Sequence, residues 1–566
     1  MRPRSLLLVL SVSLVGALAA CPVDPAVPPP DPDPVPDPDT SDVLFEPDHV
    51  LLVDIELAAA DWDTLRFQSR SIVDIFGGDC LAQPFADPFS YFTASVTVDG
   101  ETMTDVGVRK KGFLGSLNAD KPSLKIKFDE FVGGRRLHDL SRLTLNNNVQ
   151  DPSAIRQCLG YGVFAAAGVP APRCNFAHVT VNGVDLGLYT HVESMDRHLI
   201  GRAFDDDTGD LWEGTLSDFR TGWTGTFEKK TNKEVVDKAH LEAVRLAAEA
   251  PDDELIDQLE AQIDLDGFVT LWATESLIAH WDGYGGNTNN FYLYDDPTTG
   301  TLHFLPWGID QTFVNGPDGA PPPAVTTVGV LARRLLDLPE GRERYESEMA
   351  RLLDEAWDEA ALTAEIDRME ALIVPLVSLE THTAIDDVRA FVDGRRASVT
   401  AVLDAGLAPV TDPLRDAFCF ELIGDVDVTF ATTWGTITND DIFNTGSGTL
   451  GGTVRGTAIT PTAVGSRTGA HPEQPGRAVL QVFAAMPDES IVAAAVECDE
   501  VQLAEGTITL DGDQAIGYLV RFVPATGANE LLGLLLAGTL TLSAAGMEAG
   551  APFEGSIASE VYWFPF

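Results

Sequence analysis

The chain has 566 residues, of which 45% are hydrophobic and 22% charged, so it is too long for one ordinary domain and too apolar to be disordered throughout. Its 37 basic and 87 acidic residues give a formal net charge of −50. Such a charge repels phosphodiester backbones, so nucleic acid is not an expected partner.

The first 21 residues predict an export signal. Arg2 and Arg4 precede an apolar run that is too short for a membrane-spanning helix and that ends in small residues before Cys21. The ending "LAAC" resembles the lipobox of bacterial lipoproteins, in which Cys21 is lipidated and becomes the first residue of the mature chain. An ordinary cleaved signal peptide is the alternative. We expect an exported lipoprotein, anchored to a membrane through Cys21 at the bacterial cell envelope or surface.

Residues 22–43 predict a linker. Proline alternates with acidic residues in "PVDPAVPPPDPDPVPDPDT", a composition that cannot bury a core. Such a segment extends by ~3.1 Å per residue and holds the folded part away from the membrane. An inert disordered tether would have the same composition.

Residues 44–410 predict an α+β domain. Apolar residues alternate with polar ones in 49–57, 92–100 and 123–131, which is typical of strands. Helical spacing follows in 151–168, 240–250, 253–263, 265–281 and 341–357, and the first of these begins with an aspartate and ends with a glycine. Strands followed by helices favour the α+β class.

Residues 415–566 predict a C-terminal all-β domain of the sandwich-like type. Short alternating segments such as "VDVTFATTWGTIT" and "GYLVRFV" are separated by Gly, Asn and Asp. No concentration of His, Cys or paired acids occurs there, so we interpret this part as a binding or spacer module.

Five cysteines follow the signal segment. Export permits disulfide bonds, and we expect Cys419 to pair with Cys498 first and Cys158 with Cys174 next, with Cys80 left over. No CxxC pair or Cys/His cluster occurs, so a structural zinc site is not expected.

Two acidic residues are candidates for metal and phosphate chemistry. Asp282 lies in "HWDGYGGNTNNFYLY", residues 280–294, and Asp310 follows the apolar run of "LHFLPWGIDQTF", residues 302–313. Carboxylates and amides of this kind are ligands for magnesium, and a carboxylate can orient an attacking hydroxyl. Asp282 and Asn287 have the spacing of the acid and the metal-binding asparagine in the protein kinase catalytic loop, although asparagine in a glycine-rich stretch is also a common turn former.

Basic residues concentrate upstream in this acidic chain. They are Arg109, Lys110, Lys111, Lys121, Lys125 and Lys127. Alternation along a strand puts Lys125 and Lys127 on one face, where one of them could bind nucleotide phosphates. The alternative is an edge strand that lysines protect from aggregation.

The whole set of motifs resembles the spore coat protein H (CotH) kinase-like family over about residues 45–400. The resembling stretches are "VGVRKKGFLG", "KPSLKIKF", "LTLNNNVQDPSAIRQCLGYGVFAAAGVPAPR", "VTVNGVDLGLYTHVESMDRHLI", "WDGYGGNTNNFYLY" and "FLPWGIDQTF". The resemblance implies an atypical, secreted or surface protein-kinase-like fold. It further implies ATP and a divalent cation, Mg²⁺ or Mn²⁺, as cofactors, and Ser or Thr of proteins as acceptors.

The resemblance also implies roles for single residues. Asp282 would be the catalytic base or a metal ligand, and Asp310 the magnesium-binding acid. Asn290 is the expected further metal ligand, with Asn287 as the alternative from spacing. Many relatives read Trp-Asp-x-Asp where this chain has Gly308, so one carboxylate is missing.

The ATP-binding side would be basic. The candidates are Arg109, Lys111, Lys121, Lys125 and Lys127, with Glu193 orienting a lysine or the metal. The missing acid at Gly308 leaves an alternative from another class, a non-catalytic surface protein that keeps the fold as a structural or binding scaffold.

Overall fold

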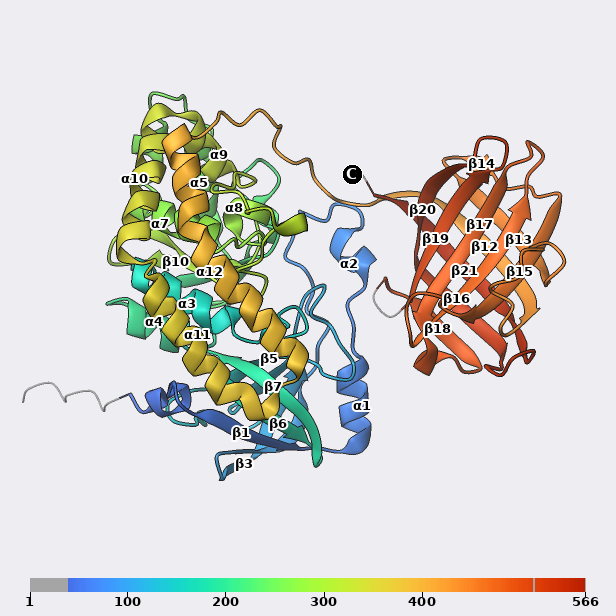
Figure 1. The fold of residues 1–566 in the computed structure, drawn as a ribbon, viewed down its shortest axis with the longest axis horizontal. Helices are drawn as coiled ribbons and strands as arrows, with labels where there is room; N and C mark the ends of the chain where they lie inside the picture. The colour runs from blue at the N-terminus through green and yellow to red at the C-terminus, as the bar shows by residue number, and fades with distance from the viewer. Residues whose placement is uncertain (1–38, 513–514, 565–566) are drawn as a thin grey trace, which may run out of the picture. The chain divides into compact units, whose positions relative to one another are not determined.

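A computed structural model describes residues 39–512 and 515–564 of the chain (Figure 1). The predicted signal segment, the lipidation site Cys21 and nearly all of the proline-rich linker lie outside these ranges. Across the described ranges, no helix is both long and apolar enough to cross a membrane.

The N-terminal strands form a closed barrel. Its strands are β1 (Val50–Glu56), β2 (Phe92–Val98), β3 (Glu101–Lys110), β4 (Leu124–Lys127), β5 (Arg142–Asn146), β6 (Cys174–Val181) and β7 (Val184–Val192). Their order is β1-β2-β3-β4-β5-β7-β6, and parallel pairing of β1 with β6 closes the ring. Alternate residues such as Leu51, Val53 and Ile55 fill the interior, as the period of two predicted. The predicted strands are confirmed, whereas their closure into a barrel was not foreseen.

Short helices connect and flank the barrel. They are η1 (Ser41–Phe45), α1 (Ala59–Phe67), α2 (Ile72–Phe76) and α4 (Arg197–Ala203). Helix α3 (Arg156–Ala167) begins where the carboxylate of Asp151 accepts a hydrogen bond of 2.9 Å from the N–H of Arg156. It ends at Gly168, whose φ of 89° is left-handed. Gly168 therefore has the expected place, whereas Asp151 lies five residues before the helix, whose N-cap is Ile155, so the predicted start is wrong.

A second sheet and a set of helices complete this region. The sheet has the order β11-β10-β8-β9, with β8 (Asp210–Gly214), β9 (Glu228–Lys229), β10 (Phe291–Asp296) and β11 (Thr301–Pro306). The helices are α5 (Ala239–Ala248), α6 (Leu255–Glu260), α7 (Leu265–Leu277), α8 (Tyr284–Asn287), α9 (Val330–Asp337), α10 (Pro339–Glu355), α11 (Glu359–Ile373) and α12 (Leu379–Ala405), with the 3₁₀ turns η2 (Thr224–Thr226), η3 (Pro317–Gly319) and η4 (Val374–Leu376).

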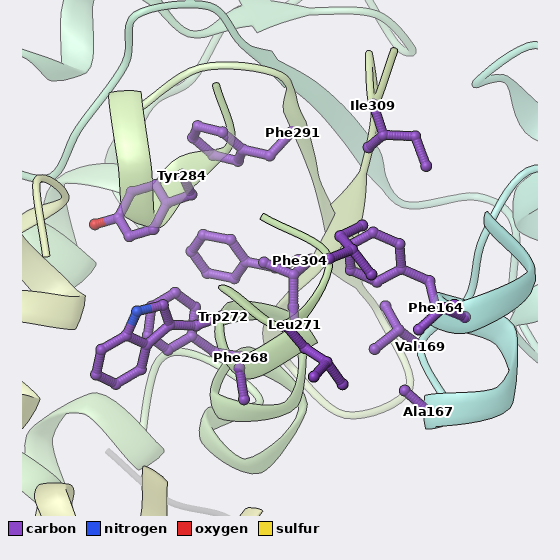
Figure 2. Close-up of a cluster of buried hydrophobic side chains, with 14 of the residues drawn as sticks. Phe164, Ala167, Val169, Phe268, Leu271, Trp272, Tyr284, Phe291, Phe304 and Ile309 are labelled. Atoms are coloured by element: carbon purple, nitrogen blue, oxygen red, sulfur yellow. The ribbon is translucent and has the colours of Figure 1, made fainter. Parts of the chain in front are cut away.

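The largest core lies between these helices and the second sheet. Figure 2 shows Phe268 and Trp272 of α7 beside Phe304 of β11, with Tyr284 and Phe291 above them. Phe291 and Phe304 stack with ring centroids 5.7 Å apart. This aromatic packing fixes α7 against β11. It thereby positions the segment after α7, which carries Asp282, and the segment after β11, which carries Asp310.

The C-terminal region is all-β, as predicted. Its strands are β12 (Glu421–Thr433), β13 (Ser447–Val454), β14 (Thr457–Ala458), β15 (Ala463–Ala470), β16 (Arg477–Ala485), β17 (Ile491–Asp499), β18 (Gly506–Leu510), β19 (Ala515–Val523), β20 (Ala528–Ala545) and β21 (Pro552–Trp563), with the 3₁₀ turn η5 (Glu500–Gln502) before β18. They form one continuous antiparallel sheet that curls around its own core, rather than the two separate sheets of a sandwich (Figure 1). The 18-residue strand β20 pairs with β19 along its first half and with β18 along its second, which joins the strands into one sheet.

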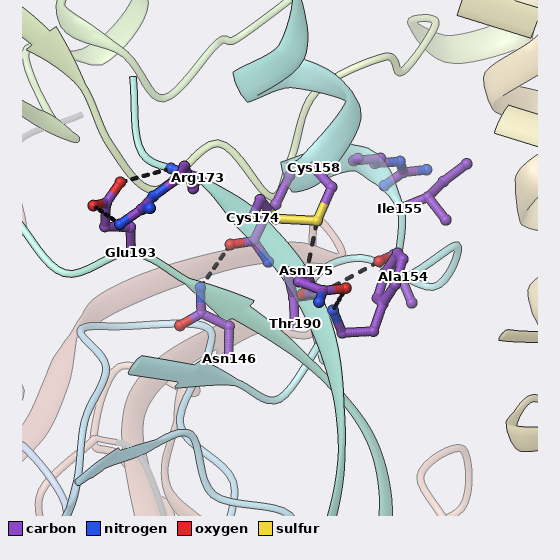
Figure 3. The surroundings of a disulfide bond; sticks show 12 residues. Asn146, Ala154, Ile155, Cys158, Arg173, Cys174, Asn175, Thr190 and Glu193 are labelled. Carbon is purple, nitrogen blue, oxygen red and sulfur yellow. Dashed lines mark hydrogen bonds and ion pairs between the residues drawn. A yellow bond between two sulfur atoms is a disulfide. The ribbon is translucent and has the colours of Figure 1, made fainter. Parts of the chain in front are cut away.

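The predicted disulfide pairing is partly wrong. Cys158 and Cys174 are bonded as expected (Figure 3), but Cys419 pairs with Cys80, and Cys498 is a buried free thiol. Cys498 faces the core of the curled sheet, where burial raises the pKa of its thiol to about 11. Cys419 instead precedes β12 and packs with Cys80 in a small apolar cluster outside that core.

Candidate active site

Seven of the predicted site residues line one cavity of about 490 Å³. They are Arg109, Lys111, Lys125, Asp282, Asn287, Asn290 and Asp310. The cavity lies between strands β3 and β4 of the barrel and the segments around α8, β10 and β11. Cations and amides or carboxylates therefore face one space, as a site for a metal-bound polyphosphate requires.

Asp282 is held by three asparagine amides. Asn287 donates to Oδ1 at 2.5 Å, Asn290 donates to Oδ2 at 2.7 Å, and Asn289 lies 3.2 Å from each oxygen. Burial raises the pKa of Asp282, and the three amide hydrogen bonds oppose that effect. The carboxylate is thus fixed in position and is more basic than an exposed aspartate.

The carboxamide oxygens of the three asparagines have different partners. That of Asn287 accepts from Arg415 at 2.5 Å, and that of Asn289 accepts from the N–H of Leu216 at 3.1 Å. The oxygen of Asn290 accepts no hydrogen bond from any described residue, and Asn290 lines the cavity. Of the two asparagines proposed as metal ligands, Asn290 is the one with an oxygen available.

Buried polar groups anchor the segment that carries Asp282. Glu275 of α7 accepts hydrogen bonds from the N–H groups of Tyr284 and Gly285 at 3.0 and 2.9 Å. The hydroxyl of Tyr284 donates to Asp218 at 2.9 Å. Burial raises the pKa of Glu275 to about 8. The glycines of the segment allow this packing, because a Cβ at Gly283 would lie 2.4 Å from Glu275.

Asp310 is a carboxylate without a hydrogen-bonded side-chain partner among the described residues. Burial raises its pKa to about 7, and the negative charges of Asp151 and Asp282 add to that effect while Lys111 opposes it. Asp151 itself is engaged at the start of α3, where Ser153 donates to it at 2.6 Å. A buried acid without a hydrogen-bonded side-chain partner is suited to bind a cation.

Gly308 adopts a backbone conformation that suits glycine. Its φ is +56°, and a Cβ there would lie 2.5 Å from the carboxamide oxygen of Asn290. Gly308 stands at the first acid of the Trp-Asp-x-Asp pattern, and Asn290 occupies the space that a side chain would need there.

The basic wall comes from β3, β4 and the residue after β3. Lys111 donates to the side chain of Asn146 and lies 5.8 Å from the ring centroid of Trp307, while Arg109 pairs with Asp87 at 2.8 Å. Lys125 has no hydrogen bond or ion pair with any described residue. Burial lowers its pKa to about 7, and nearby cations add to this. An anion in the cavity would relieve that repulsion.

Lys110 lies on the other face of β3, where it donates to the carbonyls of Arg66 and Gln68. Alternation along β3 thus explains why only its neighbours Arg109 and Lys111 line the cavity.

Three predicted ATP-binding residues lie outside the cavity lining. Lys121 donates to the carbonyl of Leu188 at 2.7 Å, and Lys127 pairs with Glu130 at 2.7 Å. Glu193 is buried between Arg173 and Arg202, each 2.7 Å away, and Figure 3 shows its contact with Arg173. Glu193 therefore orients arginines near the Cys158–Cys174 disulfide and makes no described contact with the lysines of the cavity.

Four further residues that the sequence motifs did not indicate lie at or beside the cavity. Glu213 and Lys230 form an ion pair of 2.6 Å that lines it, Arg70 lies over Phe89 and Phe113, and Arg415 contacts the Asp282 segment. Glu213 and Lys230 come from strands β8 and the end of β9, which have no motif of their own.

The oxygen atoms around the cavity supply some, but not all, of the ligands that a hard divalent cation needs. Among the described residues, no three His, Cys, Asp or Glu side chains gather as a metal cluster. The free carboxylate of Asp310 and the free amide oxygen of Asn290 are nevertheless the oxygen ligands that Mg²⁺ or Mn²⁺ prefers, and magnesium takes much of its coordination from water and phosphate.

Comparisons with known proteins show what this region is similar to. Residues 108–387 match the family described as CotH kinase protein. The Bacillus subtilis (strain 168) inner spore coat protein H is 25% identical over 288 residues, covering 47% of this chain and 76% of that protein. The inner spore coat protein H-like protein of the same organism is 26% identical over 282 residues, covering 49% and 78%. The Helicobacter pylori proinflammatory kinase CtkA has a TM-score of 0.29 and 8% identity, covering 50% of this chain and 93% of that one, which supports no argument about the site.

Proposed function

We propose that this chain, which carries a CotH kinase domain over residues 108–387, is an exported protein kinase that transfers the γ-phosphoryl group of ATP to Ser or Thr of surface or envelope proteins. The observation that carries the proposal is the meeting of Asp282, Asp310, Asn290, Lys111 and Lys125 around one cavity. The match to a kinase family implies ATP use and suggests protein substrates. The acceptor, the cation and the anchor are parts of the proposal.

The proposed reaction is an in-line displacement. The acceptor hydroxyl oxygen forms a bond to the γ-phosphorus while the bond from that phosphorus to the bridging oxygen breaks, and ADP leaves with the electron pair. The hydroxyl proton passes to Asp282, whose raised pKa suits a base. Lys111 and Lys125 hold the phosphates, and Asp310 with Asn290 would hold Mg²⁺ or Mn²⁺. When bound, the cation neutralises charge on the phosphate oxygens.

The proposed location is the bacterial cell envelope. The lipobox-like ending at Cys21 and the proline-rich segment 22–43 support a lipoprotein whose folded part stands away from the membrane. Two disulfides in the described region agree with an oxidising compartment. ATP would then have to reach the site before export is complete or from an extracellular supply.

The test is phosphate transfer by the purified full-length chain with labelled ATP and Mg²⁺ or Mn²⁺. Incorporation into a protein acceptor that disappears in Asp282→Ala and in Asp310→Ala supports the kinase. Thermal unfolding of each variant shows whether it still folds. Absence of both incorporation and any nucleotide-dependent shift in the melting temperature would overturn the proposal.

One observation favours a second candidate, a non-catalytic surface scaffold. Gly308 stands where the resemblance implies an acid in many relatives, and Asn290 lies so close that an added side chain would collide with it. In that case nucleotide could bind without transfer. Nucleotide-dependent stabilisation with no incorporation for any protein acceptor would favour the scaffold over the kinase.

A further inference from the structure

Arg415 contacts the segment that carries Asp282 from far along the chain. Its Nη1 donates to the carboxamide oxygen of Asn287 at 2.5 Å, and its Nη2 lies 3.2 Å from both the carbonyl oxygen of Asn287 and the hydroxyl of Thr288. Arg415 lies outside residues 108–387, the part that matches the kinase family. It therefore supplies a contact that the family match does not include.

These contacts fix which way the amide of Asn287 points. A guanidinium can only donate and an ionised carboxylate can only accept. Arg415 donates to the side-chain oxygen of Asn287, so the side-chain nitrogen of Asn287 faces Asp282 and donates to it at 2.5 Å. Without Arg415 the amide could rotate and turn its oxygen toward the carboxylate, which would repel it. The orientation of Asp282 thus depends on a residue that does not touch it.

Several neighbours hold Arg415 in place. Its carbonyl accepts from Arg220 at 2.5 Å, and its guanidinium lies 5.0 Å from the ring centroid of Phe418 and 5.8 Å from that of Trp223. Four residues further on, Cys419 is bonded to Cys80. Cys80 packs in one apolar cluster with Trp223 and Phe418, so the disulfide ties the Arg415 segment to the wall of the cavity.

We propose that Arg415 is a positioning residue for Asp282, supplied by the segment 415–419 and locked in place by the Cys80–Cys419 disulfide. The expected effect on kcat rests on the proposed kinase function. The expected effect on the orientation of the Asn287 amide can be measured without catalysis. It makes the segment after the kinase domain part of the site, so the domain alone is incomplete.

The first experiment is kinetic and uses the full chain. Arg415→Ala is expected to lower kcat for phosphate transfer by about 10- to 100-fold and to change KM for ATP by less than about threefold, since the phosphate-binding residues are untouched. Arg415→Lys should keep part of the activity, and free guanidinium should restore part of it to Arg415→Ala. The Cys80→Ser, Cys419→Ser double variant should also lower kcat, as Arg415→Ala does. Arg521→Ala, on β19, is the control and should match the wild type.

The second experiment does not need activity. The side-chain amide signals of Asn287, assigned by their loss in Asn287→Asp, should be sharp and protected from exchange in the wild type and should lose protection in Arg415→Ala. An unchanged kcat or unchanged protection in a folded Arg415→Ala protein would overturn the inference. If the wild type transfers no phosphate, the kinase proposal fails, and the amide signals still decide the role of Arg415.

Discussion

Asn290 donates a hydrogen bond of 2.7 Å to Asp282 while its own carboxamide oxygen accepts none from the described residues. Asn287 donates to the same carboxylate, but its oxygen is taken by Arg415. Two asparagines that look alike in the sequence therefore differ in what they can offer to a cation.

This difference predicts unequal effects of two alanine substitutions. Asn290→Ala removes a free oxygen ligand and should abolish the Mg²⁺- or Mn²⁺-dependent part of nucleotide binding, a loss of about 10-fold or more in affinity. Asn287→Ala should leave that part within about threefold. Isothermal titration calorimetry with and without the cation measures both. Equal losses, or a larger loss in Asn287→Ala, would contradict the assignment of Asn290.

The carboxylate of Asp310, which has no side-chain hydrogen-bond partner among the described residues, predicts a stabilising substitution. Burial and two nearby acids disfavour its charge in the ligand-free protein, so Asp310→Asn should raise the free energy of unfolding by on the order of 1 kcal/mol. The same variant should lose the extra stabilisation that a divalent cation with nucleotide gives the wild type. Thermal unfolding with and without these ligands measures both effects, with the exposed Asp318→Asn as the matched control. A lower melting temperature in the ligand-free Asp310→Asn protein would be the contrary result.

Gly308 predicts that an acid cannot be introduced at this position without strain. Gly308→Asp places a Cβ against Asn290 and asks an aspartate to adopt a left-handed φ, so it should destabilise the fold by about 1–3 kcal/mol. It should also weaken cation-dependent nucleotide binding, because Asn290 has to move. Gly300→Asp is the control, since Gly300 also has a positive φ but meets no atom within 4 Å. Tighter cation binding in Gly308→Asp would show that the space is available.

The sequence predicted the fold class, and the candidate residues that it indicated include seven that line one cavity. Asp282 and Asn290 lie in one motif and Asp310 in another, and packing of Tyr284 and Phe291 against Phe304 of β11 brings the two segments together. The sequence could not show which of Lys125 and Lys127 faces the cavity. A period of two tells which face of a strand a residue lies on, but not which other residues surround it. The surroundings of each lysine determine whether it can bind a ligand. Lys127 forms an ion pair with Glu130, whereas Lys125 lines the cavity.

Long-range pairing was the hardest part to predict. Nothing local distinguishes Cys419 from Cys498 as a partner, because a disulfide depends on where the fold places each sulfur atom. The same holds for Arg415, an isolated arginine in a connecting segment. The barrel closure depends on parallel pairing between β1 and β6, which are separated by more than a hundred residues, and alternation within a strand carries no information about it.

The low pKa of Lys125 predicts proton uptake on nucleotide binding. With a pKa of about 7 this lysine is largely neutral at pH 8, and phosphate oxygens would favour its charged form, so a proton should be taken up at pH 8 and almost none at pH 6. Calorimetric titration with ATP in buffers of different ionisation enthalpy measures the uptake. Lys125→Met should reduce it and Lys127→Met should not. Uptake that is the same at both pH values, or unchanged in Lys125→Met, would contradict this role.

The Glu213–Lys230 pair predicts acid-sensitive stability. Burial alone would raise the pKa of Glu213, but the charge and hydrogen bond of Lys230 outweigh it and lower the pKa from about 4.5 to about 2. A lowered carboxyl pKa stabilises the fold above the unfolded value, here by on the order of 3 kcal/mol, and the contribution is lost as pH falls from about 4.5 toward 2.

Glu213→Gln should therefore be less stable than the wild type at pH 7, with a gap that narrows as the pH is lowered from 5 to 3. Urea unfolding at several pH values measures the gap. Glu473→Gln, an exposed acid in a turn of the C-terminal region, should show no such change. A gap that stays constant down to pH 3 would mean that the pair does not hold the pKa of Glu213 down.

The bond between Cys80 and Cys419 also closes residues 80–419 into a covalent ring, because the two cysteines are 339 positions apart. A protease that cuts the backbone once inside that ring leaves a single molecule, whose pieces part only when a reductant is added. A chain nicked in this way would keep the Arg415 segment tethered to the residues packed around Cys80.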